Sequence, residues 1–217
     1  MNEILFFAHT LIVVAFALLA LRLGKNALIA FIALQGILAN VFVVKQISLF
    51  GFCVTCSDVF AIGGILSLNL LQEYFGKEAA KESIRLSLLT LVFFALMSQI
   101  HLFYNPSVSD QTHNAFQMIF SSTPRIVFAS IGTFYLVQSM DVRLFPFLRG
   151  IFPVRVAISL LFSQLIDTAL FSFLGLYGLV ESVFDIIFMS FLIKCIIIAI
   201  SSPFVLFSKR MVKHVSL

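Results

Sequence analysis

The sequence contains no tryptophan and very little charge. Of its 217 residues, Asp, Glu, Lys and Arg together make up 11%, hydrophobic residues make up 61%, and the mean hydropathy is +1.10. A water-soluble domain of this length needs more polar surface than so few charged side chains provide, which excludes an ordinary soluble globular protein. The composition instead indicates a polytopic α-helical membrane protein.

Proline, glycine and cysteine are also scarce, with 5, 10 and 3 residues. Because there is no linker, low-complexity tract or block of like charge, we expect one membrane domain over residues 1–217. Cys53 and Cys56 form a Cys-x-x-Cys pair, but no second pair or nearby His cluster completes a metal site, so structural thiols are favoured over zinc. We therefore expect no metal and no cofactor.

The sequence is rich in long apolar runs, each near the roughly 20 residues that a helix needs to cross a bilayer. The runs are continuous and do not alternate, which excludes an outer-membrane β-barrel. The predicted fold is all-α, with about seven transmembrane helices at approximately 4–21, 27–44, 55–75, 84–104, 118–140, 155–177 and 184–207. The first run lacks a convincing cleavage site and is expected to be retained. The third run is interrupted by glycines, so a broken or re-entrant element is the alternative there.

The basic residues fall mainly in alternate connections. Eleven of the fourteen Lys and Arg follow the first, third, fifth or seventh run, whereas the other connections contain Lys45 alone. Since cytoplasmic loops carry an excess of Lys and Arg, we predict an N-terminus outside and a C-terminus in the cytoplasm. Six helices is the alternative count, with the first run as a peripheral addition. The net charge of +4 is thus a topology signal, and no nucleic-acid partner is expected.

The sixth run carries an unusual number of polar groups. Ser159, Ser163 and Asp167 recur every four residues, with Gln164 and Thr168 beside them, so they form one stripe on a helix. A carboxylate at mid-depth costs about 2.5–3.5 kcal/mol on insertion scales, which places it toward the protein interior or a wet cavity. We expect this helix to line a pore or a binding site.

Asp167 and Lys194 both lie near the middle of their runs, the sixth and the seventh. Opposite charges at equal depth on adjacent antiparallel helices predict a buried ion pair. A purely structural pair is one interpretation. The other is that one member exchanges its partner for a ligand or a proton.

Two further polar groups lie near the ends of runs. Asn69 and Glu73 share one helix face, with Gln72 near them, and Glu73 is close enough to the predicted boundary to pair with Lys77 at the interface. Arg125 is a basic residue at the outer end of a run, against the charge bias. It is a candidate for binding an anionic or planar group through its guanidinium, and snorkelling to lipid headgroups is the alternative.

No enzyme motif accompanies these groups. The sequence has no nucleophile triad, phosphate-binding glycine loop or metalloprotease helix motif, so we do not expect an enzyme. Of the 27 Phe residues most must face lipid or pack between helices, but Phe162, Phe171 and Phe173 lie near the polar stripe. These three rings are candidates to sandwich an aromatic heterocycle.

Three strings of residues resemble the queuosine precursor transporters, a family also described as a vitamin-uptake type. In chain order they are Leu70-Leu-Gln-Glu73-Tyr-Phe-Gly76-Lys77-Glu-Ala-Ala80, then Ser163-Gln164-Leu-Ile-Asp167-Thr168-Ala-Leu-Phe171, then Lys194 with Ser202-Pro203 further on. The resemblance implies a multi-pass protein of the bacterial inner membrane, similar in fold to the substrate-binding subunits of energy-coupling-factor transporters. It also implies import of 7-deazapurine bases for queuosine salvage, namely 7-cyano-7-deazaguanine, 7-aminomethyl-7-deazaguanine or queuine.

The resemblance gives the polar residues a role. A carboxylate can bind the N–H edge of a deazaguanine, and amides or basic side chains can bind its carbonyl. Many family members carry Asp where this sequence has Asn69, which leaves Asn69 to hydrogen-bond a base without carrying a proton. The expected substrate-binding residues are Asn69, Gln72, Glu73, Arg125, Ser163, Gln164, Asp167 and Lys194.

Two other functions remain open from the sequence. One is a substrate-capture subunit of an ATP-driven vitamin uptake system, with a separate ATPase. The other is a non-transporting membrane scaffold whose buried charges fix the helix register. The expected partners are the small-molecule substrate and the lipid bilayer, and the sequence leaves homo-oligomerisation open.

Overall fold

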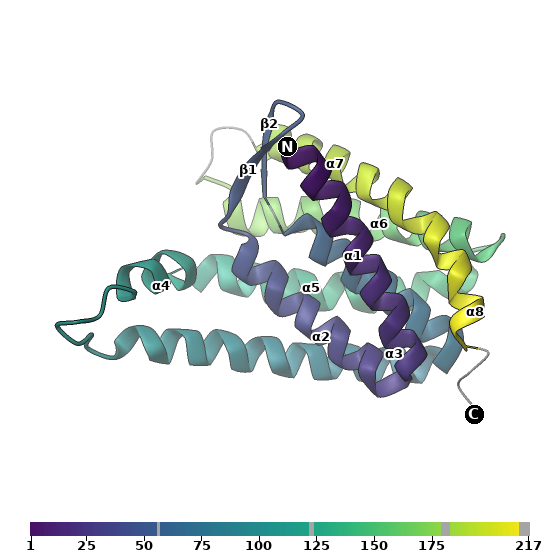
Figure 1. The fold of residues 1–217 in the computed structure, drawn as a ribbon, viewed down its shortest axis with the longest axis horizontal. Coiled ribbons are helices and arrows are strands. Elements are labelled where there is room, and N and C mark those ends of the chain that lie inside the picture. Colours follow the sequence, from purple (N-terminus) through teal and green to yellow (C-terminus); the bar gives the residue numbers. More distant parts are fainter. Residues whose placement is uncertain (56, 122–123, 179–182, 213–217) are drawn as a thin grey trace.

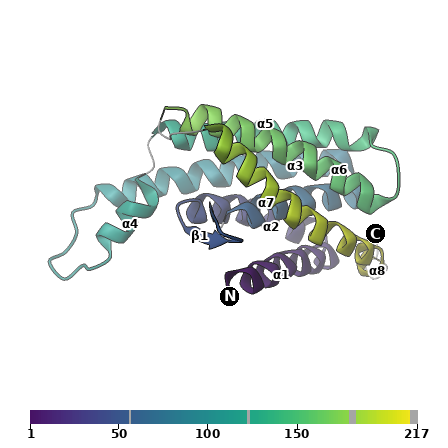
Figure 2. The same cartoon turned by 90° about the horizontal axis from the view of Figure 1, so that it is seen from above.

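A computed structural model of the chain describes residues 1–55, 57–121, 124–178 and 183–212, which are mostly helical. The long helices pack side by side (Figure 1), and seen from above, α1 and α2 lie along one side and α5 and α6 along the other (Figure 2). The elements are α1 (Asn2–Leu23), α2 (Lys25–Phe42), β1 (Gln46–Leu49), β2 (Phe52–Thr55), α3 (Asp58–Phe103), α4 (His113–Phe120), α5 (Pro124–Leu144), η1 (Phe145–Phe147), α6 (Phe152–Phe171), η2 (Ser172–Leu176), α7 (Val183–Phe204), η3 (Val205–Phe207) and α8 (Ser208–Val212).

The helix α3 is too long to be one membrane helix. Its 46 residues would extend about 69 Å if straight, whereas the hydrocarbon core is about 30 Å thick. Gly76 interrupts the helix with φ 85° and ψ 170°, a conformation that glycine adopts without the steric cost of a Cβ. The chain turns there, so α3 contains both the third and the fourth predicted segments.

Five described helices are long and apolar enough to cross a membrane: α1, α2, α3, the α6 region to Gly175, and the α7 region from Ile186. The helix α5 has 21 residues, but it carries the charges of Arg125, Asp141 and Arg143. The prediction of an α-helical membrane protein is confirmed by these helices. The count of seven and the outside location of the N-terminus stay predictions.

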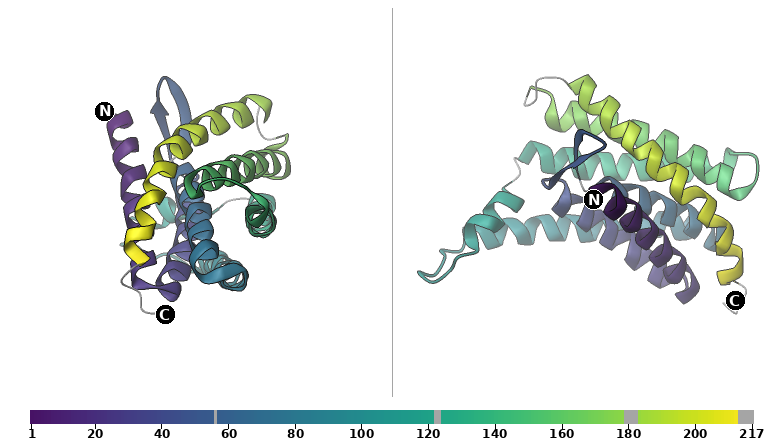
Figure 3. Two further views of the ribbon diagram at one scale, coloured as in Figure 1. Left: turned by 90° about the vertical axis from the view of Figure 1, so that its right-hand side faces the viewer. Right: turned by 45° about the horizontal axis from the view of Figure 1, so that its top comes forward.

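The connections between helices gather at two ends of the molecule. The connection from α1 to α2, the turn within α3, η1 and α8 lie at one end, and the β-hairpin, α4 and η2 lie at the other (Figures 1 and 2). Seen from its right-hand side, the molecule has α1 (purple) along one edge and α7 (yellow-green) running obliquely across it (Figure 3, left). The first end holds the connections that carry most of the Lys and Arg, which agrees with the predicted topology.

A β-hairpin stands where the third predicted segment begins. Its strands β1 and β2 pair antiparallel. Phe50 and Gly51 form the turn with φ of 51° and 85°, positive at both central positions as two-residue hairpins prefer. The hairpin is held against α1 because the side-chain amide of Asn2 donates to the carbonyl of Ser48 at 2.9 Å. The predicted start at residue 55 is therefore wrong, and the helix begins at Asp58.

The fifth predicted segment, 118–140, is also wrong in its bounds. Its first residues belong to the short helix α4, which ends at Phe120, and α5 begins at Pro124. Proline suits the first turn of a helix because its missing N–H would have no partner there. At the other end α5 continues to Leu144, so Asp141 lies inside the helix.

The helices α1, α2 and α3 meet at Gly63. A Cβ built on Gly63 would lie 2.5 Å from Cγ1 of Val13 in α1 and 2.6 Å from Oε1 of Gln35 in α2. Only a residue without a side chain allows the three backbones to come this close, as is common where membrane helices pack.

Candidate functional site

Three helices bring one buried lysine and two carboxylates together. Lys194 of α7 is 4% exposed, and its Nζ lies 2.9 Å from Oδ2 of Asp167 in α6 and 3.8 Å from Oδ1 of Asp58 at the start of α3. Nζ also donates to the hydroxyl of Thr168 at 2.9 Å. The predicted ion pair of Asp167 and Lys194 is confirmed. Asp58 is a third member, which the depth argument does not identify because Asp58 lies at a predicted helix end.

This cluster has more negative than positive groups. One ammonium faces two carboxylates, and Oδ2 of Asp58 is buried without a hydrogen-bond partner among the described residues. The side chain of Asp167 is 27% exposed, whereas Lys194 is almost fully enclosed. Since buried charges need good geometry to offset their desolvation, the cluster fixes how α3, α6 and α7 approach one another. Asp167 is the member that a ligand can reach most easily.

Asp141 of α5 forms a second buried carboxylate site. It is completely buried, and its Oδ1 accepts hydrogen bonds from the hydroxyl of Ser163 at 2.7 Å and from the hydroxyl of Ser159. Within the described part of the chain no lysine or arginine forms an ion pair with Asp141, and its Oδ2 has no hydrogen-bond partner. The polar stripe on α6 therefore takes part in two sites. Its Asp167 pairs with Lys194, and its Ser159 and Ser163 donate hydrogen bonds to Asp141.

Asp141 is not among the site residues predicted from the sequence. The predicted fifth run ends at residue 140, which leaves Asp141 in a connection outside the membrane. One signal that could identify it is Gln138, which lies three residues earlier and therefore on the same helical face. In the structure Gln138 is 3% exposed.

Three buried amide side chains on α3 and α6 have polar atoms without a partner among the described residues. Asn69 and Gln164 are fully buried, and in neither side chain do the amide nitrogen and oxygen have a hydrogen-bond partner among the described residues. Gln72 donates from Nε2 to the carbonyl of Val142 at 2.9 Å, which joins α3 to α5 beside Asp141, and its Oε1 has no partner. An unsatisfied buried polar group costs about 1–3 kcal/mol. Such groups indicate a place where a polar ligand or water completes the hydrogen bonding.

Glu73 lies at one edge of this region and pairs with Arg155 of α6. Arg155 Nη1 lies 3.2 Å and 3.1 Å from the two carboxylate oxygens, and its guanidinium lies 4.6 Å from the centre of the Phe145 ring. Pairing with Lys77 is one of the interpretations open from the sequence, and the structure shows Arg155 as the partner instead. Gly76 ends the first helical part of α3, so the four-residue spacing does not place Lys77 on the face of Glu73.

Arg125 lies at the start of α5 and is exposed. Its Nε donates to the carbonyl of Leu174 in η2 at 2.7 Å, which ties the end of the sixth run to α5. The start of α5 and the turn within α3 lie at opposite ends of the molecule (Figure 1). The structure therefore does not bring Arg125 and Glu73 together in one site.

The two ionic clusters enclose the unpartnered polar groups along two helices. On α3, Asp58 and Glu73 are separated by 15 positions, about 22 Å of helix, and Asn69 lies between them. On α6, Arg155 and Asp167 are separated by 12 positions, about 18 Å. The serines bound to Asp141, and Gln164, also lie in that interval. The interval therefore contains buried donors and acceptors that no described residue satisfies.

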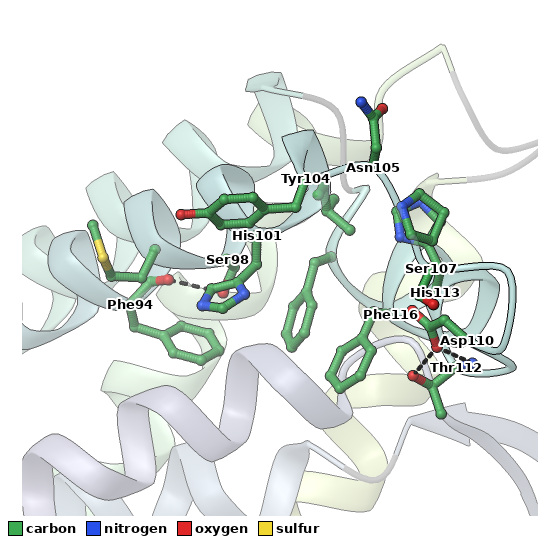
Figure 4. Close-up of a pocket in the computed structure, with 14 residues that line it drawn as sticks. Phe94, Ser98, His101, Tyr104, Asn105, Ser107, Asp110, Thr112, His113 and Phe116 are labelled. Carbon is green, nitrogen blue, oxygen red and sulfur yellow. Dashed lines mark hydrogen bonds between the residues drawn. The ribbon is translucent and has the colours of Figure 1, made fainter.

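An open groove lies elsewhere, between the end of α3, the connection 104–112 and α4. Its volume is about 710 Å³, and aromatic side chains that include Tyr104 and Phe116 line it (Figure 4). Asp110 on its wall accepts hydrogen bonds from the backbone N–H and the hydroxyl of Thr112, both at 2.7 Å, which lower the pKa of Asp110. None of the predicted site residues lines this groove.

The structure does not test the expected role of the Cys-x-x-Cys pair. Cys56 and the side chain of Cys53 lie outside the described residues. Among the residues that are described, no group of three or more His, Cys, Asp or Glu is placed to hold a metal ion.

Long apolar helices around buried carboxylates, amides and one lysine define a polytopic membrane protein with a polar interior. Residues 55–208 match the family model described as "Putative vitamin uptake transporter". The chain is 32% identical over 201 residues to a protein of Bacillus subtilis (strain 168) named "Probable queuosine precursor transporter", with 88% of this chain and 87% of that protein covered. No solved structure matches the chain. The chain belongs to this vitamin uptake transporter family, and the resemblance expected from its sequence is confirmed.

Proposed function

We propose that the protein imports queuosine precursors across the bacterial inner membrane, so that 7-deazapurine bases become available for queuosine salvage. The observation that carries the proposal is the 32% identity, over most of both chains, to a protein named for that substrate. The buried amides support it because a 7-deazaguanine presents donors and acceptors on its edges that could satisfy them.

In this proposal the base binds between α3, α5, α6 and α7, in the interval that the two ionic clusters enclose. Asn69, Gln72 and Gln164 supply amide donors and acceptors, and Asp167 is the carboxylate of the Lys194 cluster that is partly exposed. Ser163 bonds to Asp141 within this interval, and Lys194 and Glu73 belong to the ion pairs at its two ends. Arg125 bonds to the carbonyl of Leu174 outside the interval, so its contact with the base stays a prediction.

The ion pair of Glu73 and Arg155 offers a way to close one end of this path. Both side chains retain some exposure, 29% and 20%, and they join α3 to α6. A tilt of α6 against α3 would separate the pair and open that end, while the Lys194 cluster keeps the opposite parts of the helices together. Alternating access of this kind brings a central site into contact with each side of the membrane in turn.

The proposal is tested by queuosine in tRNA. Cells that make no queuosine are made to express this chain together with the enzymes that convert the base to queuosine in tRNA. The medium then supplies 7-cyano-7-deazaguanine, 7-aminomethyl-7-deazaguanine or queuine. We expect queuosine to appear only with the intact chain, and Gln164→Ala and Asp167→Asn to reduce it at equal membrane abundance. No rescue by any of the three bases, with insertion of the chain confirmed, would contradict the proposal.

A further inference from the structure

Among the described residues, Asp141 is a buried carboxylate that forms no ion pair with a cation. Asp58 and Asp167 both face Lys194, whereas Asp141 is 0% exposed and faces only hydroxyl groups among the described residues. A carboxylate within a membrane helix is costly unless another group compensates its charge or hydrogen bonds to it. The two serine hydroxyls compensate one oxygen of Asp141 and leave the other without a partner among the described residues.

The geometry leaves one oxygen of this carboxylate available. Ser159 and Ser163 both donate to Oδ1, which uses the two lone pairs of that oxygen and fixes the orientation of the group. Oδ2 is buried and has no hydrogen-bond partner in the described part of the chain. A carboxylate held in this way is arranged to accept N–H donors at Oδ2.

Other unpartnered amides lie on the neighbouring helices α3 and α6. The hydrogen bond from Gln72 to the carbonyl of Val142 brings α3 against α5 at the residue next to Asp141. Asn69 lies three positions before Gln72 and therefore on the same face of α3. Gln164 lies in α6, at the position after Ser163. Both amides are fully buried without partners, which supplies acceptors and donors for other edges of the same ligand.

We propose that Asp141, not Asp167, is the carboxylate that recognises the imported base. This inference rests on the proposed function. Its Oδ2 accepts the ring N–H and the exocyclic amino group of the pyrimidinone edge of a 7-deazaguanine. Asp167 is already engaged by Lys194 at 2.9 Å, so it would have to break an ion pair to take this role.

Competition for uptake tests the inference. Uptake of labelled 7-cyano-7-deazaguanine is measured against unlabelled 7-deazaguanine and against 7-deazahypoxanthine, which lacks the exocyclic amino group. In the parent chain we expect 7-deazaguanine to compete about 10- to 100-fold better, the range for one hydrogen bond to a charged group. In Asp141→Asn the amide oxygen can still accept from both serines, but an NH2 group takes the place of Oδ2. The preference for 7-deazaguanine over 7-deazahypoxanthine should therefore fall to within about threefold. Asp110→Asn makes the same chemical change in an exposed connection and should keep the parent preference.

A second variant keeps the test decisive if Asp141→Asn is not inserted. Ser163→Ala retains the carboxylate but removes one of the two bonds that orient it. It should weaken competition by 7-deazaguanine several-fold and competition by 7-deazahypoxanthine less, because 7-deazahypoxanthine donates only its ring N–H to the carboxylate. Equal effects on the two competitors would overturn the assignment.

Three other outcomes would overturn the inference in distinguishable ways. If the parent chain imports no deazapurine, the proposed function fails and the inference fails with it. If the parent imports the base and Asp141→Asn keeps the full preference, only the assignment of Asp141 fails. If Asp141→Asn keeps the preference but its uptake no longer depends on a proton gradient, the carboxylate binds a proton and not the base.

Discussion

Two adjacent glycines on α3 are expected to respond to the same substitution with opposite signs. At Gly63 an alanine Cβ would lie 2.5 Å from Cγ1 of Val13 and 2.6 Å from Oε1 of Gln35. At Gly64 the nearest such atom is Cβ of Gln35, at 3.9 Å, which is an ordinary van der Waals contact. The pair therefore compares one chemical change in two environments on one helix.

The magnitudes follow from packing and helix propensity. Val13 and Gln35 are 7% and 1% exposed, so neither side chain has room to move away from a new methyl group. Overpacking of this kind costs about 1–3 kcal/mol, and the clash at Gly63 is severe enough to exceed the gain of about 1 kcal/mol that alanine brings to a helix. Gly64→Ala receives the gain without the clash.

Thermal unfolding of the detergent-solubilised protein measures both effects. With a shift of about 2–4 °C per kcal/mol for a chain of this size, Gly63→Ala should unfold several degrees below the parent. Gly64→Ala should unfold at the parent temperature or slightly above it. The packing of α1, α2 and α3 described above would be refuted if Gly63→Ala were as stable as the parent, or if both variants lost the same stability.

The ion pairs give two further predictions. Lys194→Met leaves Asp167 in the interior without its cation and should cost about 3–5 kcal/mol, seen as low membrane abundance and early thermal unfolding. Lys45→Met, at an exposed lysine, should behave like the parent, and adding Asp167→Asn to Lys194→Met should recover part of the loss. Glu73→Gln breaks the partly exposed pair with Arg155 and should change stability by no more than about 1 kcal/mol in the same assay. A large loss of stability in Glu73→Gln would show that this pair does more than close one end of the path.

The helical segments follow from the sequence because membrane helices need continuous apolar runs of fixed length. The predicted range 4–21 corresponds to α1, and the boundary predicted after residue 75 corresponds to the turn at Gly76. The β-hairpin is not predicted, because each of its strands has only four residues and a hydropathy pattern cannot separate them from the adjacent helix. The start of α5 is missed for a related reason, since α4 is apolar but only eight residues long.

The sequence predicts contacts in the candidate site only where the charge of a residue and its depth in the membrane identify its partner. Asp167 and Lys194 have opposite charges at similar depth, and the structure confirms their pairing. The partner of Glu73 is a long-range one, 82 positions away along the chain, and depends on how α6 packs against α3. Asp141 is missed because α5 extends past the predicted boundary and carries this residue into the interior. The sequence also does not show that Ser159 and Ser163 point toward α5, where they donate to Asp141.

Counterflow in liposomes that contain only this purified chain tests the central claim most directly. Liposomes loaded with unlabelled 7-cyano-7-deazaguanine are diluted into labelled base, so that exchange needs neither an energy source nor a partner protein. We predict rapid entry of label, which a 7-deazaguanine competitor suppresses and which Gln164→Ala slows. Entry no faster than in liposomes without protein, for 7-cyano-7-deazaguanine and for queuine alike, would contradict the account.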